Sequence, residues 1–166
     1  MRTEHLADRH DVAGFTCGVK AMDDCLARHG LENERRGLSR TYVLLDDGDA
    51  VAGYYTLTVG GVMREVLPNA YGRGLPPFEI GMVLLARLAV AQDRQGSGLG
   101  RDLLIDAIDQ ALRVSERSAA PFIAVDPIDE QARAFYEHFG FRSIAGDEAG
   151  RMFLRVDHAK AALGRD

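Results

Sequence analysis

The sequence has little of several features that would have placed it in other classes of protein. Its 166 residues include only two cysteines, Cys17 and Cys25, too few for a disulfide framework and without companion ligands for zinc. We expect both thiols to be reduced and partly buried, and no metal to be bound. No apolar run approaches the length of a membrane span, and the N-terminus lacks a signal peptide's apolar segment, so we expect a cytoplasmic protein without membrane contact.

Lysine is also scarce, because 18 of the 20 basic residues are arginine and only Lys20 and Lys160 are lysine. Arginine suits phosphate recognition through its planar fork, although a GC-rich genome would produce the same bias. The net charge of −5 argues against non-specific nucleic-acid binding over the whole surface. Any contact with RNA must therefore use a local patch of arginines.

Length and composition predict one globular domain spanning residues 1–166, with 46% hydrophobic and 27% charged residues. Periodicity and turn signals divide the chain further. They predict helical residues at 17–37, strands at 41–45 and 50–59 around a turn at 46–49, an irregular loop at 68–78, a strand at 79–91, a helix at 99–117, a strand at 122–125, a helix at 129–139, and a hairpin of 141–144 with 152–156, followed by a polar tail.

The most informative stretch is the glycine-rich turn Arg94-Gln95-Gly96-Ser97-Gly98-Leu99-Gly100-Arg101, which joins a strand to a long amphipathic helix. Such a turn exposes backbone N–H groups at a positive helix terminus and lets an anion approach closely. The Gly-Lys-Ser/Thr of a Walker A loop is absent, and Arg101 breaks the Gly-x-Gly-x-x-Gly spacing of a dinucleotide fingerprint. The turn therefore predicts a phosphate cradle of another kind, with a purely structural turn as the alternative.

Two motifs resemble those of the GCN5-related N-acetyltransferase (GNAT) family. Gln95-x-x-Gly98-x-Gly100 is similar to its acetyl-CoA pyrophosphate loop, and Asp129-x-x-Ala132-x-x-Phe135-Tyr136 to its Asn-x-x-Ala-x-x-Phe-Tyr helix. The resemblance covers nearly the whole chain. It implies an α/β (α+β) fold, with helices flanking a mixed central sheet that is splayed at the CoA site.

On the second helix, Ala132, Phe135 and Phe139 recur at helical spacing and should face the core. Tyr136 should then project from the edge of that apolar stripe. By resemblance it would be the general acid that protonates the departing CoA thiolate. A core tyrosine in an ordinary amphipathic helix is the alternative interpretation.

The resemblance also implies a set of cofactor contacts. The backbone N–H near Val90 would stabilise the developing oxyanion, and main-chain groups of Leu88 and Val90 would pair with the pantetheine arm. Asp129 replaces the usual Asn, and because it offers no amide donor its contact to pantetheine is left open. The acetyl-CoA-binding residues expected in this way are Leu88, Ala89, Val90, Gln95, Gly96, Ser97, Gly98, Leu99, Gly100, Arg101, Asp129 and Phe135.

No side chain is singled out by the sequence as the general base. Glu79, Asp126 and Asp129 are candidates, each of which could equally be a solvated strand-end or cap carboxylate. A dedicated base is unnecessary for an α-amino group, whose pKa near 7.7–8.0 leaves a substantial neutral fraction at pH 7. This weakly favours an α-amine over a lysine side chain as the acetyl acceptor.

The N-terminal half narrows the resemblance to the toxin branch of the family. The matching stretches are Phe15-Thr16-Cys17-Gly18, Met22-Asp23-Asp24-Cys25-Leu26, Ser39-Arg40-Thr41-Tyr42-Val43, Gly53-Tyr54-Tyr55-Thr56-Leu57 and Leu85-Ala86-Arg87-Leu88-Ala89-Val90. This branch acetylates the amino group of aminoacyl-tRNA, which blocks translation. Its members are neutralised by a ribbon-helix-helix antitoxin and are generally homodimers.

Recognition of tRNA would require arginines, and we expect Arg36, Arg40, Arg73 and Arg87 to contact substrate. Ion-paired surface arginines are an equal alternative, except that Arg87 on a central strand should be partnered or at a site. Two other functions stay open: acetylation of a small-molecule amine or protein N-terminus, and a non-catalytic CoA-binding or antitoxin-scaffolding domain. Tyr136 and the intact glycine loop argue against the non-catalytic function.

Overall fold

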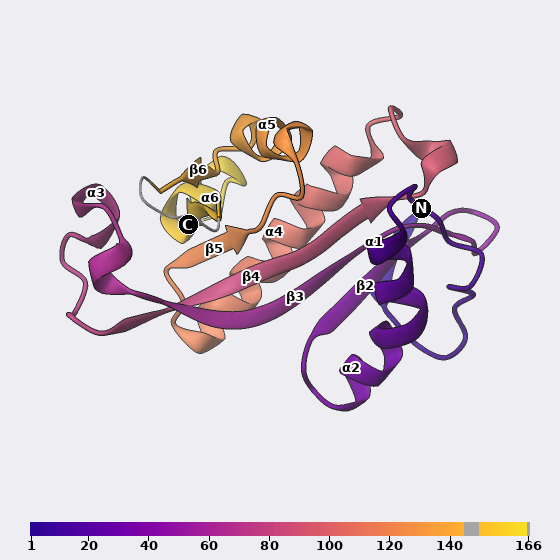
Figure 1. Ribbon diagram of the computed structural model, residues 1–166, viewed down its shortest axis with the longest axis horizontal. Coiled ribbons are helices and arrows are strands. Elements are labelled where there is room, and N and C mark those ends of the chain that lie inside the picture. Colours follow the sequence, from indigo (N-terminus) through magenta and orange to yellow (C-terminus); the bar gives the residue numbers. More distant parts are fainter. Residues whose placement is uncertain (145–149, 166) are drawn as a thin grey trace. The chain divides into compact units, whose positions relative to one another are not determined.

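The computed structural model describes residues 1–144 and 150–165 of the chain (Figure 1). Within these residues seven strands form one mixed sheet in the order β1-β2-β3-β4-β5-β7-β6. The β4–β5 pair is parallel, and the registered pairs β1–β2, β2–β3, β5–β7 and β6–β7 are antiparallel. The predicted α/β fold with a mixed sheet and flanking helices is thus confirmed.

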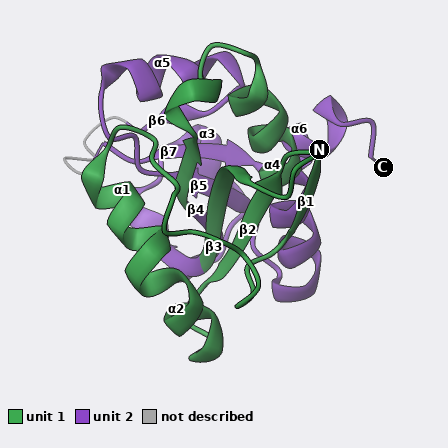
Figure 2. Ribbon diagram, turned by 90° about the vertical axis from the view of Figure 1, so that its right-hand side faces the viewer, with its two compact units in different colours: residues 1–58, 86–107 green, residues 59–85, 108–166 purple. Residues whose placement is uncertain are grey.

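The chain forms two compact units, coloured separately in Figure 2. Unit 1 comprises Met1–Thr58 and Ala86–Ala107, and unit 2 comprises Val59–Leu85 and Ile108–Asp166. Strands β3 (Val51–Met63) and β4 (Glu79–Val90) and helix α4 (Leu99–Ser118) contribute to both units. The expectation of a single domain across residues 1–166 stays a prediction.

Unit 1 is a β-meander with a helical run. Strand β1 (Arg2–His5) pairs with β2 (Arg40–Leu45), which pairs with β3 through a turn at Asp46–Asp49. The helical run consists of α1 (Lys20–Asp24), a π-helical segment (Cys25–Gly30) and α2 (Leu31–Arg35). It falls within the predicted residues 17–37, whereas β1, which carries polar and charged residues in place of an apolar alternation, was not predicted.

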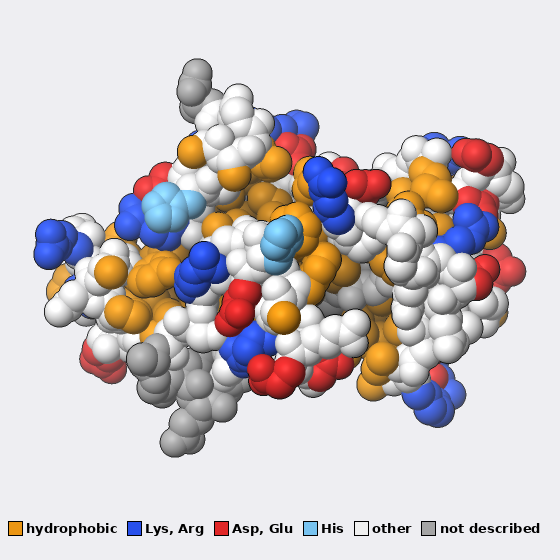
Figure 3. Space-filling view, turned by 90° about the horizontal axis from the view of Figure 1, so that it is seen from above, with side chains coloured by type: hydrophobic (Ala, Val, Ile, Leu, Met, Phe, Trp, Pro, Cys, Tyr) orange, Lys and Arg blue, Asp and Glu red, His pale blue; other side chains and the backbone are white. Residues whose placement is uncertain are grey.

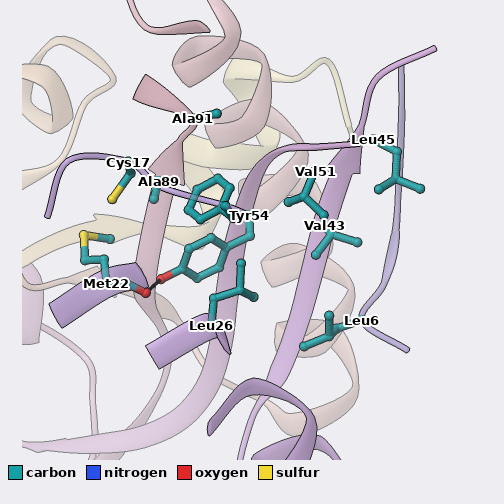
Figure 4. Close-up of a cluster of buried hydrophobic side chains, with 11 residues drawn as sticks. Leu6, Cys17, Met22, Leu26, Val43, Leu45, Val51, Tyr54, Ala89 and Ala91 are labelled. Carbon is teal, nitrogen blue, oxygen red and sulfur yellow. Dashed lines mark hydrogen bonds between the residues drawn. The ribbon is translucent and has the colours of Figure 1, made fainter. Parts of the chain in front are cut away.

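The core of unit 1 forms where α1 meets the strands (Figure 4). Met22 and Leu26, four residues apart on the helical run, pack with Val43 and Tyr54 of the strands. The Tyr54 ring is fully buried and its hydroxyl donates to the Met22 carbonyl oxygen at 2.8 Å. Burial raises the pKa of Tyr54, and the nearby Arg87 charge partly opposes this rise. Cys17 is buried and Cys25 half-buried, and both are free thiols, as predicted.

Unit 2 is organised by the short strand β5 (Phe122–Val125), whose four residues are all buried. It pairs with Met82–Leu85 of β4 and with β7 (Met152–Arg155), which also pairs with β6 (Arg142–Ser143). Helix α5 (Glu130–His138) follows β5, and a core of aromatic and aliphatic side chains includes Phe122 and Phe153.

Three predictions were wrong in detail within unit 2. The loop expected at 68–78 contains a short helix, α3 (Asn69–Gly72), which starts after Pro68, where proline's fixed φ favours helix initiation. The residues expected to be a polar tail form α6 (Val156–Ala162), which buries Ala159. The strand predicted to end at residue 59 continues to Met63 as the second half of β3. Glycines Gly60 and Gly61 obscured this continuation, because glycine is unfavourable in strand interiors.

The long helix α4 confirms the prediction made for residues 99–117. Its apolar positions recur at helical spacing and are buried on one face, namely Leu103, Leu104, Ala107, Ile108, Ala111 and Leu112. The helix begins directly after the glycine-rich turn, so its N-terminus is placed at that turn.

Candidate active site

The glycine-rich turn ends in an uncapped helix N-terminus. The carbonyl oxygen of Gly98 accepts the N–H groups of Arg101 (3.1 Å) and Asp102 (3.3 Å), so Gly98 is the N-cap residue directly before α4. Glycine has no side chain with which to cap the first turn, and the amides of Leu99 and Gly100 have no intrahelical partner. They are available to an anion at the positive end of a 20-residue helix.

The backbone of the turn is shaped so that this anion can approach. Gly96 and Gly98 have φ values of +76° and +89°, a conformation that favours glycine. A Cβ atom built at either position would meet nothing within 4 Å. The glycines therefore leave open space over the turn, and the residues present fit a phosphate group held by backbone amides.

The side chains of the turn hold it in place. The Gln95 Nε2 atom donates to the carbonyl oxygens of Cys17 (2.8 Å) and Val90 (3.0 Å), and the Ser97 hydroxyl donates to the Arg94 carbonyl oxygen (2.5 Å). Arg94 pairs with Asp46 (2.8 Å). Hydrogen bonds from the Ala50 and Gly48 amides, together with Arg94, lower the pKa of Asp46. The contribution of Gln95 and Ser97 to a phosphate site would thus come from their backbone.

Residues 16 and 17 were not expected to support the turn. The Gln92 N–H donates to the Thr16 carbonyl oxygen at 2.8 Å, and Asp23 of α1 accepts from the Thr16 hydroxyl and the Cys17 N–H, both at 2.8 Å. Burial alone would raise the pKa of Asp23, but these hydrogen bonds hold it below its usual range. Carbonyl acceptors leave no mark in a sequence, so no motif could have signalled this support.

Leu88 and Val90, near the end of β4, direct their backbone groups away from β3, and the Val90 carbonyl oxygen there accepts from Gln95. The Ala91 N–H donates to the Ala52 carbonyl oxygen of β3 at 2.9 Å, and the Ala89 carbonyl oxygen also lies beside β3, 3.0 Å from a Cβ built at Gly53. Because backbone groups alternate along a strand, those of Leu88 and Val90 point to the opposite side. The registered pairing of β4 with β5 ends at Leu85. The Val90 N–H therefore lies on the side of β4 away from β3, and its role as oxyanion donor stays a prediction.

A cavity of about 520 Å³ lies beside the turn within unit 1. Its walls come from the segment before α1, the β2–β3 hairpin and the residues that follow β4. They are Gly14, Phe15, Thr16, Asp46, Ala50, Val51, Ala52, Ala91, Gln92, Asp93 and Arg94. The predicted cofactor residues from Gln95 to Arg101 do not line this cavity.

Tyr136 lies on α5 in unit 2 and is a buried residue, 8% exposed. Its ring packs against Phe135 (centroids 5.4 Å apart) and Phe141 (5.6 Å), and burial raises its pKa to about 12. The hydroxyl makes no hydrogen bond to another described residue. Among the described residues, every fully buried side-chain oxygen has a hydrogen-bond partner, so the Tyr136 hydroxyl is not fully buried. The hydroxyl therefore reaches the surface as a free donor.

The prediction for α5, that Ala132, Phe135 and Phe139 face the core, was wrong. Tyr136 is the buried residue of this helix, and Ala132, Phe135 and Phe139 are only half-buried. The helix is rotated so that Tyr136 contacts Phe141 behind it, while Phe135 and Phe139 pack against each other on the flank (5.1 Å). Phe135 is thus accessible in part, as a cofactor contact requires.

The three carboxylates considered as general bases are a helix cap, an ion-pair partner and a strand-end residue. Asp129 caps α5 by accepting the Ala132 N–H at 2.7 Å. Both oxygens of Asp126 accept from Arg151, at 2.7 and 2.8 Å. Glu79 is the first residue of β4, eleven positions before Val90, and its carboxylate lies over Gly61. The interpretation as cap and strand-end carboxylates is the one that these contacts favour.

The capping contact of Asp129 leads to a stability prediction. Asp129→Ala should lower the free energy of unfolding by about 1 kcal/mol, because the α5 N-terminus loses its acceptor. Asp129→Asn keeps an acceptor oxygen and should stay within about 0.5 kcal/mol of the wild type. Urea unfolding of the three proteins checks this, and equal losses from both substitutions would contradict the capping role.

The four arginines expected to contact substrate differ in their surroundings. Arg40 pairs with Glu34 at 2.9 Å, which is the surface ion pair given above as the alternative. Arg36, Arg73 and Arg87 are exposed and form no ion pair with a carboxylate among the described residues. Within residues 1–144 and 150–165, the Arg87 guanidinium donates to the adjacent Ala86 carbonyl oxygen (2.6 Å) and has no carboxylate partner, so a role at a site stays a prediction.

Basic side chains are distributed rather than concentrated on the face drawn in Figure 3. There they stand singly or in small groups among acidic and hydrophobic side chains. Among residues 1–144 and 150–165, no cluster of three or more His, Cys, Asp or Glu side chains could hold a metal ion. No helix in the same residues is long and apolar enough to span a membrane.

Comparison with known proteins gives the class to which this fold and site belong. Residues 37–143 match the family described as acetyltransferase (GNAT) domain, and the chain belongs to this family. Among curated relatives, the tRNA-acetylating toxin of Mycobacterium tuberculosis (strain ATCC 25618 / H37Rv) is 36% identical over 159 residues, which cover 96% of this chain and 94% of the relative.

Two solved structures are similar over almost their full lengths. AtaT complexed with acetyl-methionyl-tRNAfMet superposes with a TM-score of 0.88 at 27% identity, covering 98% of each chain. A tyrosine-to-phenylalanine variant of the toxin AtaT, bound to the C-terminus of the antitoxin AtaR and acetyl-CoA, gives a TM-score of 0.82 at 25% identity. That alignment covers 99% of this chain and 98% of the AtaT chain.

Proposed function

We propose that the protein transfers the acetyl group of acetyl-CoA to the α-amino group of aminoacyl-tRNA and thereby acts as a translation-blocking toxin. The observation that carries this proposal is the open backbone cradle at the start of α4, next to the free Val90 N–H. Similarity to a tRNA-acetylating toxin over 96% of the chain supports the substrate. Both compact units would serve as one acetyltransferase domain over residues 1–166.

Unit 1 would bind and activate the acetyl donor. The amides of the turn from Gln95 to Gly100 would hold the pyrophosphate at the α4 N-terminus, with the Arg101 side chain at its edge. The backbone of Leu88 and Val90 would pair with the pantetheine arm. Acetyl-CoA supplies a thioester whose carbonyl oxygen becomes negative as the amine attacks, and the Val90 N–H would stabilise that charge.

Unit 2 would supply the proton through Tyr136. With a pKa of about 12, the phenol is protonated at any physiological pH. A free thiol has a pKa of about 8.5, so complete proton transfer to a thiolate is uphill by about 5 kcal/mol before the substrates alter either value. Tyr136 would therefore act first as a hydrogen-bond donor to the departing sulfur, and would lose its proton only as the negative charge there develops.

The acceptor needs little help from a base. An α-amino group titrates near 7.7–8.0, so a substantial fraction of it is neutral and nucleophilic at pH 7. This suits a chain in which Asp126 and Asp129 are already engaged by Arg151 and by the α5 N-terminus. A lysine acceptor, with a pKa near 10.4, would require a stronger base.

The remaining elements of the proposal concern partners and place. Arg36, Arg73 and Arg87, which form no ion pair among the described residues, would contact tRNA, and Arg40 would join them by releasing Glu34. A ribbon-helix-helix antitoxin would neutralise the enzyme. In support, the similar toxin AtaT has been solved bound to the C-terminus of its antitoxin AtaR. A homodimer in the cytoplasm, where aminoacyl-tRNA is found, completes the proposal.

Salt dependence tests the arginine contacts. At subsaturating charged tRNA, kcat/KM should fall steeply with salt, because counterions are released when arginines bind phosphates. Arg87→Glu should lower kcat/KM about tenfold and reduce the slope of log kcat/KM against log salt by about one. Acetyl-CoA affinity should be unchanged.

Arg113→Glu is the matched control, because Arg113 is an exposed arginine of α4 that pairs with Asp109. It should leave both the rate and the salt slope near wild type. A salt-independent rate, or equal effects of the two reversals, would remove the tRNA contact from Arg87.

A further inference from the structure

The turn that would hold acetyl-CoA is tied to a segment almost 80 residues earlier in the chain. The Gln95 side chain donates to the Cys17 carbonyl oxygen at 2.8 Å, and the Gln92 N–H donates to the Thr16 carbonyl oxygen at 2.8 Å. The Gln95 Nε2 atom also donates to the Val90 carbonyl oxygen at 3.0 Å. One amide group thus joins the turn, the end of β4 and the segment before α1.

The same segment is fixed to α1. Asp23, in the first turn of this helix, accepts the Thr16 hydroxyl and the Cys17 N–H through its two carboxylate oxygens, each at 2.8 Å. A displacement of the turn that carries Gln95 would pull on the Cys17 carbonyl and, through Cys17, on Asp23. The turn and α1 are therefore connected by an uninterrupted chain of hydrogen bonds.

Helix α1 in turn borders the part of β4 where the acetyl group would be presented. Met22 and Cys17 share a buried cluster with Tyr54 and Ala89, and the Tyr54 hydroxyl donates to the Met22 carbonyl oxygen (Figure 4). Arg87 lies close enough to Tyr54 for its charge to act on the phenol. A shift of α1 would thus change the packing next to Ala89 and Arg87, the residues that flank Leu88.

We infer that Gln95 is a positioning residue that couples occupation of the cofactor turn to the placement of α1 and so to binding of the acceptor. This inference rests on the proposed function and adds a coupling between its two substrates. When acetyl-CoA orders the turn, it also orders α1, and the acceptor then binds a surface of α1 that is already ordered. By reciprocity, the acceptor must strengthen acetyl-CoA binding by the same factor.

Gln95→Met is the informative variant, because methionine keeps the length of the side chain and removes both donated hydrogen bonds. Gln92→Met is its matched control. Gln92 belongs to the turn at Gln92–Arg94, its side-chain amide makes no hydrogen bond to a described residue, and its backbone N–H survives the substitution. Gln95→Arg restores donors and should restore the coupling in part.

Hydrogen exchange with acetyl-CoA alone reads the coupling without an acceptor. In the wild type and in Gln92→Met, acetyl-CoA should slow amide exchange in residues 95–101 and also in residues 16–24. In Gln95→Met the protection of residues 95–101 should persist, and the protection of residues 16–24 should be lost. The inference is overturned if acetyl-CoA does not protect residues 16–24 in the wild type, or if this protection survives in Gln95→Met. If residues 95–101 are unprotected in the wild type, the cofactor site fails and the inference fails with it.

Kinetics with charged tRNA gives the second readout. Gln95→Met should raise the acceptor KM at saturating acetyl-CoA about tenfold, within the roughly 5–150-fold range of coupling between sites. Its acetyl-CoA Kd without acceptor should change less than threefold, and Gln95→Arg should recover most of the acceptor KM. Equal losses in acetyl-CoA Kd and acceptor KM, or no recovery with arginine, would show a structural role alone and overturn the coupling.

Discussion

Replacing Tyr136 by phenylalanine should lower kcat by about 10²–10⁴-fold, the usual contribution of a positioned general acid. The fold should survive, because the Tyr136 hydroxyl makes no hydrogen bond to another described residue while its ring packing with Phe135 and Phe141 is retained by phenylalanine. Acetyl-CoA affinity should also survive, since the predicted pyrophosphate contacts come from the turn after β4. Single-turnover acetylation and calorimetry measure the two effects separately.

Tyr71→Phe provides the control for this substitution. Tyr71 is a half-buried tyrosine of the same unit whose ring packs against Phe122, and it carries no predicted role. Removal of the Tyr71 hydroxyl should leave kcat within about twofold of the wild-type value. A loss of less than about threefold for Tyr136→Phe would assign the proton to water or to another group.

The second large effect is expected at the cradle. Gly98→Asp should weaken acetyl-CoA binding by about 100-fold or more, for two reasons. A non-glycine residue at a φ of +89° costs roughly 1–2 kcal/mol, and a carboxylate facing a pyrophosphate adds like-charge repulsion. Isothermal calorimetry with acetyl-CoA measures the loss directly.

Gly74→Asp separates these effects from general destabilisation. Gly74 has a φ of +80° and, like Gly98, open space around a built Cβ, but it lies outside the predicted cofactor residues. This variant carries the same charge and nearly the same backbone strain, and its acetyl-CoA affinity should match wild type. Unchanged affinity in Gly98→Asp would remove the cradle assignment.

The parts of the fold that the sequence predicted best are those with a strong period or a motif. Helix α4 repeats its apolar residues at helical spacing and ends the glycine-rich turn, so its start at Leu99 could be read directly. The parts that it missed are short or polar. Strand β1 carries Arg2, Thr3, Glu4 and His5, and only its pairing with β2 makes it a strand.

The candidate site shows the same division. The glycines of the turn have positive φ and open space, as expected from the need for close approach of an anion. The rotation of α5 could not be read from spacing, since Tyr136 and Phe135 are adjacent and only packing against Phe141 decides which of them is buried. The hydrogen bonds from Gln95 to the Cys17 and Val90 carbonyls were likewise hidden, because any residue supplies a carbonyl.

Arginine pairing was the least predictable feature. The sequence contains enough acidic residues to neutralise any one arginine, and which ones are paired depends on side-chain geometry. The structure pairs Arg40 with Glu34 and leaves Arg87 exposed on β4, where the neighbouring Ala86 carbonyl is its one acceptor among the described residues. A charged side chain on a central strand is costly unless it faces water or a ligand, so charge reversal at the exposed Arg87 is an informative test of substrate contact.

Acetyl transfer from radiolabelled acetyl-CoA decides whether the acetyl acceptor is the α-amino group of aminoacyl-tRNA. Purified protein is incubated with total charged tRNA, with the same tRNA after deacylation, and with small amines, and the RNA fraction is counted. If aminoacyl-tRNA is the acceptor, charged tRNA should carry label that is lost on mild deacylation and is reduced at least 100-fold in Tyr136→Phe. An unlabelled RNA fraction together with labelled small amines would contradict this assignment.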